Sequence, residues 1–466
     1  METIGIFRNQ KQIHAFENQG YKLVLDIASG SVHVFDDLAF ELVQQVTEKS
    51  RDELLQIYED QYKEAEIIEA LDEIDSLIEE GRLFSQEAVI DRKRLIHQNS
   101  PIKAMCLHVT HDCNLRCKYC FADGGDYSGP KALMSAEVGK KALKFLVDHS
   151  QNRRNLEVDF FGGEPLMNFE VVKELVAYGR ELEKEYDKNF RFTITTNGVL
   201  LTDEIDEYMK KEMSNVVLSL DGRPEVNDRM RRTLNGQGSF DVIAPKFQKS
   251  VAARGKRDYY IRGTFTAHNL DFAKDVEFYH EMGFVHTSME PVVSDPKHDY
   301  ALTEDHLPQI LAEYDTLADK YVEWRRQGKP FSFFHFNVDL DHGPCIIKKM
   351  IGCGAGSEYV AVSPEGDLYP CHQFVGEDDF KMGTVENGIV KPEIPERFSN
   401  LNIYTKEDCK ECWARYFCSG GCHAHAYHAN KDLKKPFKVA CEMERKRVEC
   451  AIGIQAALAL GGTDNE

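Results

Sequence analysis

Between residues 100 and 325, short apolar runs alternate with stretches in which apolar residues recur at helical spacing. The runs predict strands, because they are short and rich in β-branched and aromatic residues, at 104–110, 156–161, 191–196, 216–220, 258–265 and 284–290. The periodic stretches predict helices at 136–149, 170–185 and 203–212, with Ser135 and Thr202 as N-caps. Such alternation is typical of an α/β fold with a parallel sheet.

Polar sequences follow several of these predicted strands. A cysteine triplet follows the first strand, Gly-Gly-Glu-Pro follows the second, Thr-Asn-Gly follows the third, and Ser219 and Asp221 close the fourth. Six strand–helix units are too few for an eight-stranded barrel. In complete barrels, catalytic groups lie at the C-terminal ends of the strands. We therefore expect a site where these sequences meet.

Residues 1–90 show a different pattern, which predicts a small separate module. Two apolar runs at 21–25 and 32–35 flank a turn at Gly30 and indicate a hairpin, and Asp36 is placed to cap a following helix. A second helix, carrying Ile67, Leu71, Ile74 and Ile78, stops at Gly81, and 82–84 favours a wing strand. These elements suggest a winged-helix-like module.

The function of that module is open between three readings. Its predicted helices are rich in Glu and Asp, which disfavours nucleic acid. An edge of the hairpin can instead accept an added peptide strand. The third reading is a simple N-terminal cap on the rest of the chain.

Composition narrows the functional class. The 466 residues carry a formal net charge of −21, which argues against wholesale phosphate binding. No apolar run approaches the roughly 20 residues of a membrane span, and the N-terminus has no signal-peptide core. We therefore expect a cytoplasmic protein with neither a nucleic-acid nor a membrane partner.

The cysteines point to metal chemistry. There are 13, an odd number in a chain without a secretion signal, so a disulfide framework is disfavoured. Cys113, Cys117 and Cys120 have C-x3-C-x2-C spacing. A [4Fe–4S] cluster normally takes four thiolates, so three from one loop leave an iron open. Buried structural cysteines or part of a zinc site are the alternatives.

A second cysteine field follows residue 330. It contains a C-x2-C-x5-C-x3-C run and further cysteines on either side, and its members are Cys353, Cys371, Cys409, Cys412, Cys418, Cys422 and Cys441. Cys345 lies eight residues before Cys353. Because Zn²⁺ favours four thiolates, a zinc ribbon is the competing interpretation for 409–422.

The triplet followed by Gly-Gly-Glu-Pro resembles the radical S-adenosylmethionine (SAM) superfamily, and the seven-cysteine order resembles its SPASM extension. Over 20–37, 105–126, 152–169, 190–201 and 229–243, the chain looks like the maturases of SCIFF peptides (six cysteines in forty-five residues). The resemblance implies a precursor-recognition domain at 1–90, a partial (β/α)6 barrel at 98–325, a SPASM domain at 330–452 and a tail at 453–466.

The resemblance also implies the cofactors, which are SAM and three [4Fe–4S] clusters. The SAM-binding cluster takes the triplet, and the implied SAM contacts are Tyr119, Gly162, Gly163, Glu164, Pro165, Asn197 and Ser219. An arginine meets the SAM carboxylate, with Arg231, Arg232 and Arg262 as candidates.

The same resemblance divides the C-terminal cysteines between two auxiliary clusters. One takes Cys409, Cys412, Cys418 and Cys441, and the other takes Cys353, Cys371 and Cys422. The fourth ligand of the latter is either Cys345 or a thiolate of the substrate.

The implied activity is sactipeptide-type thioether formation. A 5′-deoxyadenosyl radical removes hydrogen from a residue of a cysteine-rich precursor peptide, and a cysteine sulfur closes onto that carbon. The leader of the precursor binds the N-terminal module, and a ferredoxin or flavodoxin supplies electrons. Anaerobic sulfatase-type formylglycine formation is the alternative reaction, and a non-catalytic zinc- and peptide-binding scaffold is the alternative of another class.

Overall fold

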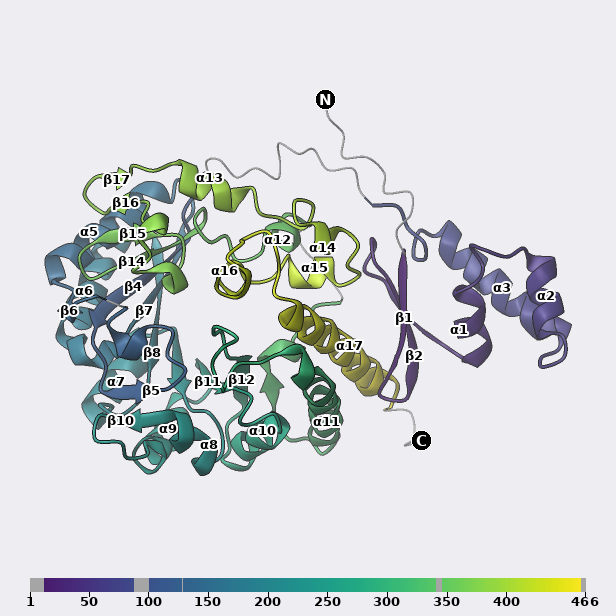
Figure 1. Cartoon of the computed structure of the whole chain (residues 1–466), viewed down its shortest axis with the longest axis horizontal. Coiled ribbons are helices and arrows are strands. Elements are labelled where there is room, and N and C mark those ends of the chain that lie inside the picture. The colour runs from purple at the N-terminus through teal and green to yellow at the C-terminus, as the bar shows by residue number, and fades with distance from the viewer. Residues whose placement is uncertain (1–11, 88–99, 128, 341–345, 462–466) are drawn as a thin grey trace.

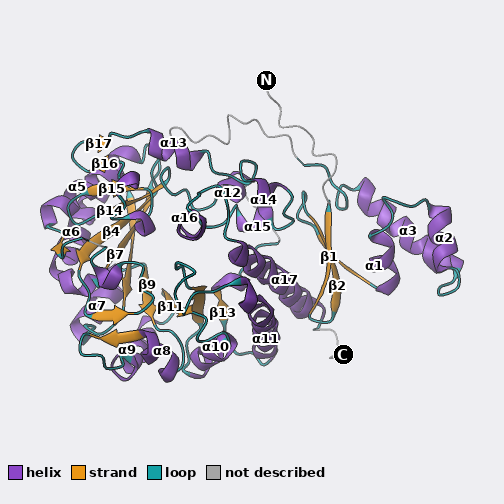
Figure 2. Cartoon of the chain, viewed as in Figure 1, coloured by secondary structure: helices purple, strands orange, loops and turns teal. Residues whose placement is uncertain are grey.

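The computed structural model describes residues 12–87, 100–127, 129–340 and 346–461. Figure 1 shows a sheet wrapped by helices, a cysteine-rich region beside its open end, and an N-terminal module on the far side of the long helix α17 (Lys438–Leu460). Figure 2 shows that the module combines strands and helices, whereas the cysteine-rich region consists mostly of loops and short helices.

The central sheet confirms the predicted partial barrel. Six strands lie side by side and every neighbouring pair is parallel. They are β4 (Ala104–His111), β7 (Asn155–Gly162), β8 (Asn189–Thr196), β9 (Asn215–Ser219), β11 (Asp258–Phe265) and β12 (His286–Pro291). Each corresponds to one of the predicted strands.

The helices between these strands begin where the sequence predicts. The side chain of Ser135 accepts a hydrogen bond from Val138 N at 3.2 Å, and Thr202 accepts one from Ile205 N at 3.3 Å. The first three are α5 (Ala136–His149), α6 (Phe169–Tyr186) and α7 (Asp203–Glu212), and they are followed by α8 (Pro224–Met230), α9 (Phe240–Arg254), α10 (Phe272–Glu281) and α11 (Leu307–Arg326).

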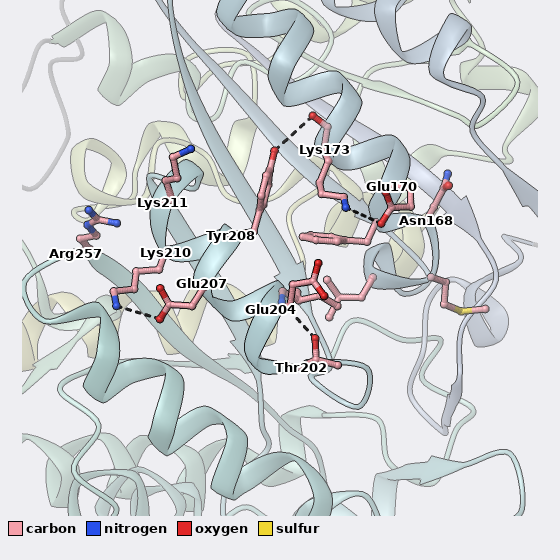
Figure 3. Close-up of a pocket in the computed structure, with 14 residues that line it drawn as sticks. Asn168, Glu170, Lys173, Thr202, Glu204, Glu207, Tyr208, Lys210, Lys211 and Arg257 are labelled. Atoms are coloured by element: carbon pink, nitrogen blue, oxygen red, sulfur yellow. Dashed lines mark hydrogen bonds and ion pairs between the residues drawn. The ribbon is translucent and has the colours of Figure 1, made fainter.

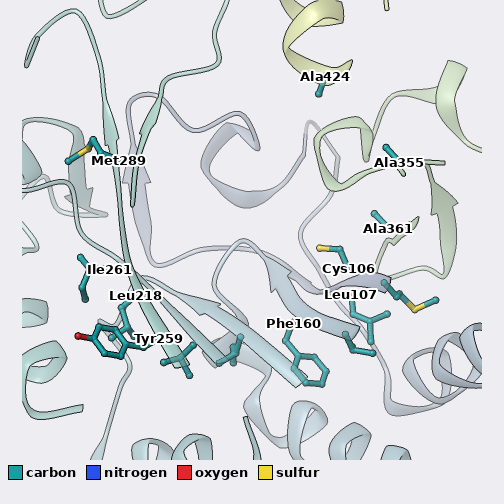
Figure 4. Packing of buried hydrophobic residues seen from close by; sticks show 14 of the residues in the cluster. Cys106, Leu107, Phe160, Leu218, Tyr259, Ile261, Met289, Ala355, Ala361 and Ala424 are labelled. Atoms are coloured by element: carbon teal, nitrogen blue, oxygen red, sulfur yellow. The ribbon is translucent and has the colours of Figure 1, made fainter. Parts of the chain in front are cut away.

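The barrel core fills the space between the sheet and these helices. Phe160, Phe190 and Phe192 are fully buried, and the rings of Phe160 and Phe190 each stack on Phe192 at 5.6 Å. Figure 4 shows how residues of several strands share this core, among them Phe160, Leu218 and Ile261. Because side chains alternate along a strand, the other face of the sheet is free to carry polar residues.

The N-terminal module has its own core and one strand that was not predicted. Its antiparallel sheet is ordered β1 (Ile13–Asn18), β2 (Tyr21–Asp26) and β3 (Val32–Phe35), and β1 is the addition. Helices α1 (Asp37–Val43), α2 (Arg51–Tyr58) and α3 (Glu64–Glu79) follow, and Asp36 caps α1. The predicted wing at 82–84 is wrong, because these residues form bends.

The C-terminal region extends the barrel sheet. β14 (Tyr359–Val362) pairs in parallel with β4 and is followed by β15 (Asp367–Tyr369), while at the other end of the sheet β13 (Ser332–Phe333) pairs with β12. The remaining elements are short, namely α12 (Ile346–Ile351), β16 (Gly383–Thr384), β17 (Gly388–Ile389), α13 (Glu393–Ser399), α14 (Glu407–Lys410), α15 (Arg415–Cys418) and α16 (His423–Asn430).

Helix α17 corrects the expected tail and joins the parts of the molecule. It continues to Leu460, so residues 453–460 are helical and Ile454 is buried. One face of α17 packs on α11, and another packs on the hairpin of the N-terminal module through Phe16, Leu23, Leu25, Val448 and Ile452. None of the helices in the described part of the chain is both long and apolar enough to span a bilayer.

We predict that Phe192→Ala lowers the free energy of unfolding of the barrel by about 3–5 kcal/mol, because it leaves a cavity beneath two stacked rings. Phe334 is 52% exposed, so Phe334→Ala is the matched control and should change stability by about 0.5 kcal/mol or less. Urea denaturation followed by near-UV circular dichroism measures both. Equal effects of the two substitutions would contradict this account of the core.

Candidate functional site

A cavity of about 200 Å³ opens at the C-terminal ends of the barrel strands. The loop after β4 and the ends of β7, β8, β9, β11 and β12 all contribute to its lining. Nine of the ten predicted site residues of the barrel line it, namely Cys113, Cys117, Tyr119, Cys120, Gly162, Gly163, Glu164, Asn197 and Ser219. The tenth, Pro165, is buried at the start of the short helix η2 (Pro165–Asn168) and is not in the lining.

Residues 162–164 hold the cysteine loop through backbone contacts. Gly163 N donates to Thr110 O at 2.9 Å, and Glu164 N donates to Asp112 O at 2.9 Å. A Cβ atom at Gly163 would lie 2.0 Å from Asp112 O, so only glycine fits here. The chain just before the first cysteine is therefore fixed by the end of β7.

The carboxylate of Glu164 connects the end of β7 to the end of β8 through hydrogen bonds. It accepts hydrogen bonds from Thr196 Oγ1 and Asn197 N, both at 2.7 Å, and from Leu166 N at 3.1 Å. The Asn197 amide in turn donates to Asn114 Oδ1 at 2.8 Å and to Cys113 Sγ at 3.6 Å. Glu164 and Asn197 thus position the cysteine loop as well as lining the cavity.

The three cysteines of this loop fit a cluster with one open iron. All three are free thiols in the same cavity wall. Burial raises the pKa of Cys113 to about 11 and that of Cys117 to about 12, so their thiolates require compensating positive charge. Among the described residues, no three Cys, His, Asp or Glu side chains surround a single point as they would a lone metal ion.

A buried network places one cation at the cavity. The Tyr119 hydroxyl donates to Asp221 Oδ2 at 2.6 Å and accepts from Arg231 Nη1 at 3.0 Å. Nε of Arg231 is buried and has no partner, whereas Arg232 is exposed and does not line the cavity. The unpartnered Nε of Arg231 is a donor that a carboxylate ligand would satisfy. Arg262 also lines the cavity and is about half exposed, with Nε 3.9 Å from Glu290.

Two carboxylates inside the barrel were not predicted as site residues. Burial raises the pKa of Asp159 on β7 to about 7, and Thr195 Oγ1 lies 3.5 Å from it. Glu290 on β12 has a pKa well below its usual range despite burial, because His335 at 3.2 Å and Arg262 favour its ionised form. The sequence feature that could have identified them is a charged residue at an inward-facing position of an otherwise apolar strand.

The seven described cysteines of the C-terminal field form two groups. Burial raises the pKa of Cys418, and the charges of Cys441, Cys409 and Cys412 raise it further, so these four lie within electrostatic reach of one another. Burial likewise raises the pKa of Cys371, with added contributions from Cys422 and Cys353. We call 353, 371 and 422 the first cysteine group and 409, 412, 418 and 441 the second.

Backbone amides already point at sulfur atoms of the first group. Gln373 N donates to Cys371 Sγ at 3.5 Å, and His425 N donates to Cys422 Sγ at 3.5 Å. Gln373 also lines the barrel cavity, and Cys371 lies two residues before it in the chain. The first group therefore approaches the cavity through the segment 371–373. Cys345, the candidate fourth member, lies outside the described residues.

The comparisons with known proteins agree with this geometry. Residues 107–282 match the model of the radical SAM superfamily. This chain contains a radical SAM domain. Over 337 residues the chain is 25% identical to a cysteine-type anaerobic sulfatase-maturating enzyme of Clostridium novyi, covering 67% of this chain and 85% of that one.

Solved structures share the fold over a larger part of the chain. The enzyme anSMEcpe with bound AdoMet and Cp18Cys peptide has a TM-score of 0.63 at 20% identity, covering 77% of this chain and all of that one. SuiB of Streptococcus suis bound to its precursor peptide SuiA has a TM-score of 0.51 at 18% identity, covering 93% and 99%. The similarity to SuiB thus extends beyond the radical SAM domain.

A second hollow lies on the outside of the radical SAM domain. This groove has a volume of about 980 Å³ and lies between the start of α6 and α7. Figure 3 shows the side chains that line it. Its charges are largely paired, with Lys173 2.7 Å from Glu170 and Lys210 3.3 Å from Glu207. No cysteine lines it, so the chemistry belongs to the cavity inside the barrel.

We predict that Asp159→Asn stabilises the metal-free protein increasingly as pH rises from 4 to 8.5, by up to about 4 kcal/mol. An unfolded Asp ionises near 3.8, whereas native Asp159 keeps its proton to about pH 7. The native state therefore binds more protons in this window, and the wild type loses stability through it. Urea titrations across pH measure the difference. Glu157→Gln, exposed on the same strand, is the control, and parallel curves for the wild type and Asp159→Asn would contradict the assignment.

Proposed function

We propose that this protein is a peptide maturase that forms thioether cross-links in a cysteine-rich, ribosomally made precursor. The observation that carries the proposal is the arrangement of the first cysteine group beside the cavity that the cysteine loop of the radical SAM domain lines. A thioether maturase needs both a hydrogen-abstracting centre and a place to hold a sulfur nucleophile near it. These two features supply candidates for both.

The residues at the cavity define which cofactors it would hold. Cys113, Cys117 and Cys120 would bind a [4Fe–4S] cluster. Arg231 would meet the SAM carboxylate, and Ser219 would contact the ribose. Together, cluster and SAM supply a 5′-deoxyadenosyl radical when bound and reduced. The two C-terminal groups would each hold an auxiliary cluster.

The chain's own groups then orient the substrate and manage its protons. Forming the cross-link removes one hydrogen from the acceptor carbon and one from the cysteine sulfur, so the peptide loses two hydrogens in total. The carbon loses a hydrogen atom to the radical, the sulfur loses a proton, and the one electron left over would pass to the auxiliary cluster at the first cysteine group. Glu290, which is ionised, and Arg262 line the cavity and can hold polar groups of the peptide. Asp159 is not in the lining but lies 3.5 Å from Thr195, which is, and with a pKa near neutrality it is the candidate acceptor of the thiol proton.

The fourth ligand of the cluster at the first cysteine group could come from either of two sources. Either Cys345 completes the site, or an iron stays open and binds the thiolate of the substrate. Cys353 and Cys422 are both exposed, which is compatible with access by a peptide. Iron content and electron paramagnetic resonance (EPR) of Cys345→Ala, with and without peptide, distinguish the two.

Relatives support peptide chemistry and also favour one alternative. SuiB has been solved with a precursor peptide, and its similarity in fold covers 93% of this chain. The C. novyi relative is instead a sulfatase-maturating enzyme, so formylglycine formation is the second candidate. Turnover of a full-length sulfatase but not of a cysteine-rich peptide would favour that candidate.

The decisive experiment incubates reconstituted, reduced protein with SAM and a cysteine-rich precursor. We predict a peptide two mass units lighter, with the new bond located by tandem mass spectrometry. Cys117→Ala should abolish SAM cleavage while keeping auxiliary iron, roughly eight of twelve atoms per chain. An unchanged peptide under conditions that cleave SAM would refute the substrate assignment, and colourless protein with one or two zinc ions would support the scaffold alternative.

The N-terminal module is proposed to bind the precursor leader at β3. In the described sheet β3 is an edge strand, and Val34 on it is 42% exposed. We predict that Val34→Pro, which removes a backbone donor, weakens precursor binding at least tenfold in fluorescence anisotropy while SAM cleavage without peptide persists. Ile57→Ser, an equally exposed site on α2, is the control. Unchanged affinity in Val34→Pro would exclude this edge.

A further inference from the structure

One lysine in the cysteine-rich region is fully buried. Lys406 precedes α14, and its relative exposure is 0%. Its Nζ donates to Gly420 O at 2.6 Å and lies 3.3 Å from His423 Nδ1. A buried ammonium is rare in proteins unless an anion balances it.

Carboxylates do not supply that balance. Within the described ranges, no Asp or Glu oxygen lies within 4.0 Å of the Lys406 ammonium, although most other lysines of the barrel surface pair with carboxylates at that distance. Its two partners, a carbonyl and an imidazole, are neutral acceptors. The positive charge therefore has no protein counter-ion among the acidic side chains of these ranges.

The backbone places this ammonium between the two cysteine groups. Gly420 is the midpoint of the loop that joins Cys418 of the second group to Cys422 of the first. Three successive residues of that loop, Ser419, Gly420 and Gly421, have φ values of 59°, 88° and 70°, a left-handed turn that two glycines make possible. At the other end, Cys409 N donates to Lys406 O at 3.0 Å, so Lys406 is tied directly to the second group.

We propose that Lys406 is the shared counter-cation of the two auxiliary clusters and raises the reduction potentials of both. The proposal rests on the proposed function, because it requires clusters at both groups. An added electron makes a cluster more negative, so a nearby ammonium in a water-poor site favours the reduced form. Because Lys406 bonds the loop that connects the groups, its charge acts on the two clusters in the same direction. Lys406 would thus act through its charge alone, because its side chain is fully buried.

The test measures potentials without peptide or SAM. Full-length protein carrying Cys113→Ala, Cys117→Ala and Cys120→Ala is reconstituted, so that only auxiliary clusters report in EPR-monitored redox titrations. Lys406→Met is expected to leave the iron content intact and lower both potentials by at least about 59 mV, a tenfold change in the equilibrium constant for one electron. Lys410→Met is the matched control, since Lys410 sits between Cys409 and Cys412 but is solvent-accessible and paired with Glu407 at 2.6 Å. Its shift should be smaller.

Each outcome decides the matter. Potentials of Lys406→Met equal to those of Lys410→Met, or a shift in one cluster alone, overturn the assignment while the proposed function stands. If Lys406→Met fails to hold iron, Lys406→Arg separates the role of the charge from that of packing. Retention of iron and of both reduction potentials in Lys406→Arg supports the counter-cation. Loss of iron equal to that of Lys406→Met rejects it. A parent protein that binds no auxiliary iron at all overturns this inference and the proposed clusters together.

Discussion

The geometry of the site depends on one contact between backbones. The chain leaving β4 and the chain leaving β7 meet where Asp112 O accepts a hydrogen bond from Glu164 N, and no side chain fits between them at Gly163. The first cysteine follows directly, so its position is set by the register of two parallel strands. The carboxylate of Glu164 then fixes the end of β8, because it accepts hydrogen bonds from Thr196 and Asn197. The cysteine loop is therefore built onto the rigid part of the fold.

The polypeptide leaves several buried groups electrostatically incomplete. Cys113 and Cys117 of the loop are thiols with raised pKa values. Arg231 has an unpartnered Nε, and Lys406 has no described carboxylate beside it. Such groups are costly in a protein interior unless a ligand completes them. Bound iron would supply the positive charge that the cysteine thiolates need. The carboxylate of SAM would supply the negative charge that Arg231 needs. Cofactor loading should therefore contribute directly to the stability of the native state.

The sequence predicted the barrel well because its elements are governed by local patterns. All six strands appear at the expected places, and Ser135 and Thr202 cap helices as expected, since alternation of apolar runs and side-chain capping act over a few residues. The cysteine loop that lines the cavity could be singled out for the same reason, because the spacing of its cysteines lies within one segment. Its role as a cluster site stays a prediction. The wing at 82–84 was wrong, because a short apolar run after a glycine is compatible with bends as well as with a strand.

What the sequence could not give are contacts between distant segments. Pairing of β14 with β4, the hairpin packed on α17, and the placement of Lys406 between two cysteine groups all join residues far apart in the chain. Asp159 and Glu290 were missed because their importance follows from facing a shared interior rather than from any local spacing. Long-range packing decides such features, and no local pattern encodes it.

Helix α17 has a consequence for how the molecule responds to its ligands. Near its start it carries Cys441 of the second cysteine group, and two to three turns later Val448 and Ile452 bury the hairpin of the N-terminal module. If metal uptake shifted α17, it would also move the surface on which the N-terminal module packs. By thermodynamic reciprocity, a ligand that moved the module would then change the affinity for metal. Metal uptake and ligand binding to the module would then be coupled through this one helix.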